Sequence, residues 1–156
     1  MDHVRKTSFN GTEVKLYSGT LAGISSPVKN YAPVIIADIR MQPNTSVTLN
    51  IPASYSTFLY VLEGTLNIGD DKKPLDHDQV GWLNRNEEEA ESELSLSATS
   101  GARFILYSGE PQGGNVVSHG PFIGDTAEDI TRLYQDFRAG KMKHISTVPD
   151  SQKIIW

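Results

Sequence analysis

Short stretches in which apolar and polar residues alternate cover the middle of the chain. From Val34 to Met41 every second side chain is apolar, and Asp38 and Arg40 lie between them. A period of two is typical of a β-strand with one buried face. The pattern predicts strands over residues 34–41, 47–51, 58–62, 66–68, 80–83, 94–98 and 103–107. The run 58–62 is apolar throughout, which predicts a strand buried on both faces.

One segment near the C-terminus has the period of a helix instead. Its apolar residues fall at positions i, i+3, i+4 and i+7, namely Ile130, Leu133, Tyr134 and Phe137. Such a spacing places them on one stripe of an α-helix. Thr126 stands where an N-cap is expected, with Asp129 in the third helical position of a capping box. We therefore expect one amphipathic helix that begins after Thr126 and covers another surface of the protein.

Many short strands followed by a single helix predict an all-β protein, either a sandwich or a barrel. No helical pattern separates the strands before residue 125, which disfavours a parallel α/β sheet. A length of 156 residues suits one domain, because a chain of this size buries roughly 70% of the surface exposed in its unfolded form.

Composition and charge narrow the possible functions. Nineteen acidic against 14 basic residues leave a formal charge of −5, which argues against a nucleic-acid backbone as the main partner. The absence of Cys excludes disulfides, a thiolate nucleophile and zinc-thiolate sites. The sequence shows neither a signal-peptide pattern nor an apolar stretch of membrane-spanning length, so we expect a cytoplasmic protein with no membrane partner.

Isolated polar residues offer little catalytic chemistry. The acidic run at residues 87–93 is expected to be a solvated loop or an edge strand, because neighbouring side chains on an extended chain point to opposite sides. No Gly-x-Ser-x-Gly elbow is present, and Gly113-Gly114 resembles a turn rather than a phosphate loop. His119 precedes Gly120-Pro121, and a structural role in a turn is favoured there over that of a general base.

Two motifs give the chain a family resemblance. The segment Tyr60-Val61-Leu62-Glu63-Gly64 resembles the turn of the first cupin motif. The segment His119-Gly120-Pro121-Phe122, followed by the predicted helix, resembles the C-terminal end of pirin-family proteins. The similarity to the pirin C-terminal cupin domain runs from about residue 14 to residue 139.

This resemblance implies a fold and a set of expectations. The implied fold is an all-β cupin, a double-stranded β-helix (jelly-roll barrel), with one C-terminal α-helix. We expect an N-terminal leader at residues 1–12, a cupin β-barrel at 13–124, and a C-terminal helix and tail at 125–156 that pack on the barrel. Pirins contain two such barrels. The resemblance links them to quercetin 2,3-dioxygenase-like activity through an iron site in the first barrel, and to transcription co-regulation in animals.

The resemblance also implies where metal ligands would lie. A cupin site takes two His one residue apart, a Glu a few residues later and a further His on a second motif. The first three positions fall on or near Ile51, Ala53 and Thr57, and the stretch after Leu83 offers no His. The chain's histidines are widely separated in sequence: His3, His77, His119 and His144. We therefore expect a barrel without metal and without another cofactor.

Two functions follow as hypotheses. The first is a metal-free, non-catalytic module that binds a small molecule or a protein. The alternative is a pirin-type (quercetin 2,3-dioxygenase-like) oxygenase, with iron or another transition metal held by atypical ligands or by a site that a partner completes. The candidate ligand-binding residues of the barrel cavity are Tyr55, Tyr60, Trp82 and His119, while Leu62 and Phe104 are expected to fill the core. The apolar end Ile154-Ile155-Trp156 predicts either docking on the barrel or a homodimer.

Overall fold

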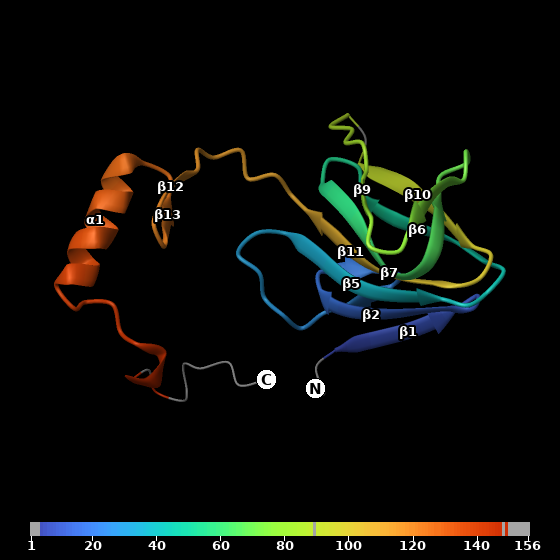
Figure 1. Ribbon diagram of the computed structural model, residues 1–156, viewed down its shortest axis with the longest axis horizontal. Helices are drawn as coiled ribbons and strands as arrows, with labels where there is room; N and C mark the ends of the chain where they lie inside the picture. The colour runs from blue at the N-terminus through green and yellow to red at the C-terminus, as the bar shows by residue number, and fades with distance from the viewer. Residues whose placement is uncertain (1–3, 89, 148, 150–156) are drawn as a thin grey trace. The chain divides into compact units, whose positions relative to one another are not determined.

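The computed structural model describes residues 4–88, 90–147 and 149, and its internal contacts separate two units. The first unit runs from Met1 to Pro111 and the second from Gln112 to Trp156. Figure 1 colours them from blue to yellow and from orange to red. No helix among the described residues is long and apolar enough to span a membrane. We describe each unit by itself.

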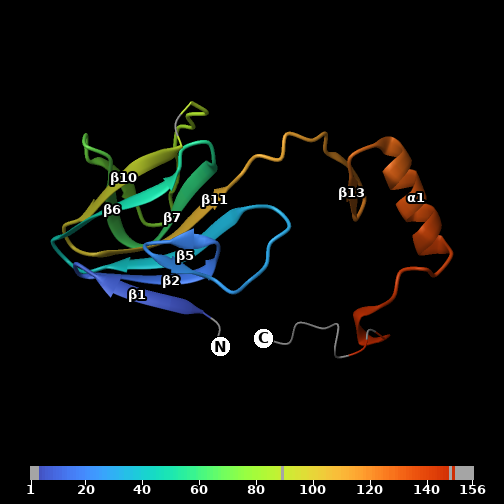
Figure 2. The ribbon, with the colours of Figure 1, turned by 180° about the vertical axis from the view of Figure 1, so that it is seen from behind.

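The first unit is a single curled antiparallel sheet with a short ribbon beside it. The sheet order is β1-β2-β5-β11-β7-β10-β6, and β8 and β9 pair with the long strand β7. Figures 1 and 2 show how the sheet curls around its own interior. The strands span β1 Arg5–Phe9, β2 Thr12–Ser18, β5 Val34–Met41, β6 Thr45–Pro52, β7 Ser56–Ile68, β8 Lys73–Asp76, β9 Val80–Trp82, β10 Glu91–Ala98 and β11 Ala102–Gly109. The ribbon consists of β3 Thr20–Leu21 and β4 Ile24–Ser25.

The alternating pattern is the cause of this architecture. In β6, Val47, Leu49 and Ile51 are buried, while Thr48 and Asn50 between them are exposed. Successive side chains of a strand point to opposite faces, so each strand contributes one apolar face to the interior. The mostly β fold with cupin-like curl and one C-terminal helix confirms the predicted fold class.

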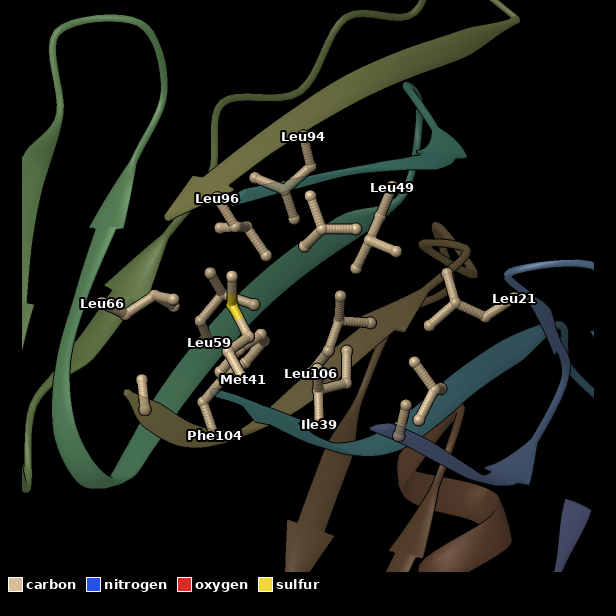
Figure 3. Packing of buried hydrophobic residues seen from close by; sticks show 14 of the residues in the cluster. Leu21, Ile39, Met41, Leu49, Leu59, Leu66, Leu94, Leu96, Phe104 and Leu106 are labelled. Carbon is tan, nitrogen blue, oxygen red and sulfur yellow. The ribbon is translucent and has the colours of Figure 1, made fainter. Parts of the chain in front are cut away.

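The core lies inside the curled sheet, where aliphatic side chains surround the aromatic ring of Phe104. Phe104 and Leu106 of the central strand β11 are fully buried, as are Leu59 of β7 and Ile39 of β5. Figure 3 shows these side chains meeting Leu94, Leu96 and Leu49 from the opposite side of the curl. Full burial of one such side chain stabilises the fold by about 1.5–3 kcal/mol, so this cluster is the main source of the unit's stability.

Strand β7 differs from the prediction in two respects. It continues from Ser56 to Ile68 instead of ending at Glu63-Gly64. Gly64 adopts a φ of +76°, and its backbone lies so close to the carbonyl of Gly101 that no Cβ would fit. The strand bends at this glycine, pairing with β11 before it and with β8 and β10 after it.

The prediction that residues 58–62 are buried on both faces is wrong. Leu59 and Val61 face the core, whereas Phe58, Tyr60 and Leu62 are only half-buried on the outer face of the sheet. In this strand, an unbroken run of apolar residues therefore has one face in the core and the other partly exposed to solvent.

None of the four strands before residue 34 was predicted, and two of them, β1 and β2, belong to the main sheet. β1 lies within residues 1–12, the segment predicted as a leader, and pairs with β2 from Arg5↔Leu16 to Phe9↔Thr12. In β2, Val14 and Leu16 are fully buried and alternate with polar or exposed residues. The alternation in residues 12–18 was the available signal for β2.

The second unit is a small hairpin packed against the helix. Its elements are β12 Val117–His119, β13 Phe122–Gly124, α1 Ala127–Arg138 and the short 3₁₀ helix η1 Ile145–Thr147. Residues 112–124, assigned to the barrel segment from the sequence, thus group with the helix. Packing of the helix and tail on the barrel stays a prediction, and the C-terminal residues 150–156 lie outside the described residues.

The helix forms where the sequence predicted it. Thr126 accepts a hydrogen bond from the Asp129 backbone N–H at 3.1 Å, and the Asp129 carboxylate accepts one from the Thr126 N–H at 3.1 Å. These two bonds complete the capping box. The Thr126 hydroxyl also donates to the Asp129 carboxylate at 2.8 Å, and this bond is the main cause that lowers the pKa of Asp129. The apolar stripe meets the hairpin, with Phe122 placing its ring edge-on to Tyr134 at 4.9 Å.

Candidate functional site

Two neighbouring pockets open at one end of the curled sheet and share Pro52 and Tyr55. The larger has a volume of about 740 Å³, and the smaller of about 220 Å³. Residues that line the larger pocket include Phe9, Leu21, Asn30, Ile35, Asn50 and Glu91. Residues that line the smaller include Ile51, Ala53, Thr57, Asn84, Ser92 and Glu93. We call these two pockets together the Tyr55 site.

Tyr55 is held in place by the tight turn between β6 and β7. Its backbone N–H donates to the carbonyl of Pro52 at 3.2 Å, and its side chain is half-buried. Burial raises the pKa of the Tyr55 phenol, and the negative charge of Glu110 raises it further. The hydroxyl therefore stays protonated around neutral pH and can both donate and accept a hydrogen bond to a molecule in either pocket.

The smaller pocket is built at the positions where a cupin would hold its metal. Ile51 and Ala53 are each 4% exposed, and they present only hydrocarbon to the pocket. Thr57, at the position of the expected Glu, shares a hydrogen bond of 2.7 Å with Ser108 of β11, both side chains being buried. A buried aliphatic side chain cannot ligate an ion, and these residues do not fit an iron site.

Histidines elsewhere do not make up for these positions. His77 lies in a turn of the first unit with its ring 3.2 Å from Asp78, while His119 and His144 belong to the second unit. Across residues 4–88, 90–147 and 149, no group of three or more His, Asp or Glu side chains gathers as metal ligands would.

The charged side chains that line the two pockets are acidic. Glu91 is the charged residue lining the larger pocket and Glu93 the one lining the smaller, and no Lys, Arg or His stands among the described lining residues. Two residues of the acidic run, Glu91 and Glu93, thus lie in β10 and at the rim of the Tyr55 site, and do not belong to a solvated loop. A molecule in these pockets meets hydroxyl, amide and carboxylate groups, which favour uncharged or cationic ligands over anions.

The other candidate residues lie elsewhere. The Tyr60 hydroxyl donates to Asp78 at 3.0 Å on the outer face, and this bond raises the pKa of Tyr60. Trp82 is 70% exposed and packs its ring against Phe58. The expectation that Tyr60 and Trp82 point into the barrel is wrong, because Leu59 and Val61 occupy the inward positions of β7.

His119 lies in β12 of the second unit, with its ring edge-on to Tyr134 at 5.6 Å. It lines a separate pocket of about 600 Å³ between the hairpin and α1. Of the predicted ligand-binding residues, the structure therefore brings only Tyr55 to the end of the sheet, and ligand binding by all of them stays a prediction.

A signal for part of this outcome was present in the sequence. If Thr57 takes the inward position of the cupin Glu, then residues 59 and 61 also point inward and residue 60 points outward. Asn84 lies in an irregular segment, where no period could show that it faces the site. Ser92 lies in β10 in phase with Leu94 and Leu96, so the alternation of residues 94–98, extended towards the N-terminus, was the available signal for it.

Comparison with known proteins identifies the family. A family model described as the pirin C-terminal cupin domain matches residues 36–143. A pirin-like protein of Arabidopsis thaliana, pirin-like protein 2, is 33% identical over 143 residues, which cover 88% of this chain and 44% of that protein. Human pirin is 28% identical over 142 residues, covering 90% of this chain and 48% of pirin.

A solved structure agrees with this result. A quercetin 2,3-dioxygenase from Acinetobacter baumannii superposes with a TM-score of 0.78 at 25% identity, covering 92% of this chain and 49% of that one. The chain thus spans about half the length of the curated relatives it matches. With a family model that spans most of the strands and the helix, and with these relatives, the chain belongs to the pirin family, in which it corresponds to the C-terminal cupin domain.

Proposed function

We propose that this chain is a metal-free cupin domain that binds an uncharged or cationic small molecule at the Tyr55 site and does not catalyse a reaction by itself. The observation that carries the proposal is the replacement of the cupin metal ligands by Ile51, Ala53 and Thr57. In place of a ligand set, Ile51 and Ala53 leave hydrocarbon and Thr57 leaves a hydroxyl that is already hydrogen-bonded. The two pockets combine apolar side chains with several convergent polar groups, as small-molecule sites do.

The hydroxyl pair beneath the pocket supports this proposal. A carboxylate at residue 57 would need a cation or several donors in so buried a place. Thr57 instead satisfies its hydroxyl through Ser108 across two adjacent strands. The Thr57–Ser108 pair therefore carries no charge that an ion would have to balance.

The ligand's polar contacts would come from the rim. Tyr55 offers a hydroxyl, Asn84 an amide, and Glu91 and Glu93 offer carboxylates. Aromatic and amide groups bind planar neutral molecules by stacking and hydrogen bonding, and the two carboxylates add attraction for a positive charge.

The experiment is a fragment screen sorted by charge, read by amide chemical shifts of the isotope-labelled chain. We expect neutral and cationic fragments to shift signals of residues around Tyr55, and anionic fragments of the same shape to leave them unchanged. Tyr55→Ala should abolish these shifts, while Tyr31→Ala, at an exposed tyrosine that lines neither pocket, should retain them. Preferential binding of anions, or equal binding to Tyr55→Ala, would refute the proposal.

An oxygenase resembling quercetin 2,3-dioxygenase is the second candidate, and the Acinetobacter structure named above is the observation that favours it. Because this chain spans about half of that protein, a partner would have to complete the site. Metal analysis of chain purified without chelators, followed by flavonol turnover under oxygen, separates the two. Stoichiometric iron, nickel or copper with turnover would replace our proposal by this one.

A further inference from the structure

The second unit contains a pocket of about 600 Å³, which strand β12 lines on one side and one face of α1 on the other. Figure 1 shows the β12–β13 hairpin beside this helix. Pockets that hold small organic molecules occupy roughly 300–1,000 Å³, so the volume suits such a ligand. We call it the Arg138 pocket, after the charged residue of α1 that lines it.

Contacts between the hairpin and α1 hold the walls of this pocket in place. The Tyr134 hydroxyl donates a hydrogen bond to the His119 carbonyl at 3.4 Å, and the two rings meet edge-on at 5.6 Å. Gly120, with a φ of +57°, lies so close to the same hydroxyl that no Cβ would fit. Because these contacts join the two walls directly, the pocket is formed before any ligand binds.

The polar side chains of the pocket wall can donate hydrogen bonds, and no acidic side chain stands among the described lining residues. The donors are Ser118, His119, Thr131, Tyr134, Gln135 and Arg138. Thr131 and Tyr134 already donate to backbone carbonyls. Within residues 4–88, 90–147 and 149, no hydrogen bond or ion pair involves the side chains of Ser118, His119, Gln135 and Arg138. Four donor side chains thus remain available to a ligand.

The charge of the pocket contrasts with that of the chain, which carries −5. The face of α1 that lines the pocket carries Arg138 and no carboxylate. At 3.6 residues per turn, Asp129 and Asp136 project from the opposite side of the helix. Their carboxylates are paired there with Arg132 and Lys141, at 2.9 Å each. These two acids therefore do not neutralise the guanidinium in the pocket.

The remaining acidic residues near α1 stand at the far end of the helix. Glu128 lies about 15 Å along the helix axis from Arg138, and Asp125 precedes the helix. A guanidinium binds a carboxylate or phosphate group through two parallel, charge-assisted hydrogen bonds. Val117 and Ile130 add apolar surface to the pocket wall, which the uncharged part of a ligand can contact.

We propose that the Arg138 pocket binds a small organic anion, with a carboxylate or phosphate group on an apolar body. Arg138 holds the anionic group, the His119 imidazole donates a further hydrogen bond, and Val117 and Ile130 contact the apolar part. The pocket lies within the second unit, so this inference does not depend on the proposed function. The two sites differ in charge, because the lining of the Tyr55 site is acidic and disfavours anions.

The test is a titration of the isotope-labelled full chain with benzoate, phenyl phosphate and uncharged benzamide, followed by amide chemical shifts. We expect the anions to shift signals of residues 117–119 and 130–138, with dissociation constants of about 1 mM. Tighter binding of one anion identifies the anionic group of the ligand. Benzamide has nearly the shape of benzoate and should bind at least ~10-fold more weakly. Equal binding of benzamide, or no shift with either anion at about 10 mM, would overturn the proposal.

Variants of two arginines on the same helix test the guanidinium itself. Arg138→Gln should raise the dissociation constants of the anions at least ~10-fold. Arg132→Gln removes the same charge outside the pocket and should leave them unchanged. Arg138→Lys keeps the charge without the paired donors, so we expect an intermediate constant. The amide spectrum verifies that each variant is folded, and equal weakening by the two glutamine variants would show a general charge effect instead of a site.

Discussion

The buried hydroxyl pair at the floor of the Tyr55 site allows a sharp test of the structure. Thr57 and Ser108 are 1% and 0% exposed, they are 51 positions apart in sequence, and they share one hydrogen bond of 2.7 Å. Thr57→Val keeps the shape of the side chain and removes its hydroxyl. The Ser108 hydroxyl then remains buried after losing this partner.

The expected magnitudes follow from this geometry. A buried polar group left unsatisfied costs about 1–3 kcal/mol, so Thr57→Val and Ser108→Ala should each lower the free energy of unfolding by about 2 kcal/mol. The double variant leaves neither hydroxyl of the pair, so no buried group is unsatisfied, and it should lose only about 1 kcal/mol, less than either single variant. The coupling energy is thus about 3 kcal/mol in magnitude.

The assay is urea unfolding followed by tryptophan fluorescence. The chain has two Trp, and a Trp156→Phe background makes Trp82, a residue of the first unit, the single reporter. All four proteins of the cycle are measured in this background at equal m-value. Additive losses in the double variant would show that the two hydroxyls do not interact and would refute this account of the pocket floor.

Three further predictions concern stability. Arg103→Leu leaves the Asp38 carboxylate buried without its main partner, which should cost about 2 kcal/mol at neutral pH. Because the bond from Arg103 lowers the pKa of Asp38, this contribution is present above the ordinary carboxyl pKa and is lost as the pH falls through the lowered value; unfolding curves of wild type and variant should converge at acid pH, and a constant difference would contradict this. Gly64→Ala forces a side chain into a positive φ and against the Gly101 carbonyl, so urea unfolding should show a loss of at least about 2 kcal/mol, and an unchanged midpoint would be evidence against the bend. Thr126→Ala removes the N-cap and should cost about 1 kcal/mol in the second unit, seen as faster amide hydrogen exchange in α1; unaltered exchange would contradict the capping role.

The period of apolar residues along the sequence was sufficient to predict those helices and strands whose formation depends on residues close to one another in the chain. The helix, its Thr126–Asp129 capping box and most of the strands follow from side chains within one or two turns or along one strand. The missing metal donors at Ile51, Ala53 and Thr57 are likewise a property of residue identity, which no folding can change.

The tertiary structure decided which surfaces those elements bring together. A period of two separates two faces of β7, but only pairing with β11 and β9 shows that Phe58 and Tyr60 belong to an exposed face with Tyr107 and Trp82. The Asp38–Arg103 ion pair joins residues 65 positions apart, a separation that no local pattern encodes. Pocket residues such as Asn84 lie on irregular backbone that is positioned by the strands around it. Long-range strand pairing and burial, which depend on the whole chain at once, therefore determined the site, while the sequence by itself determined its chemistry.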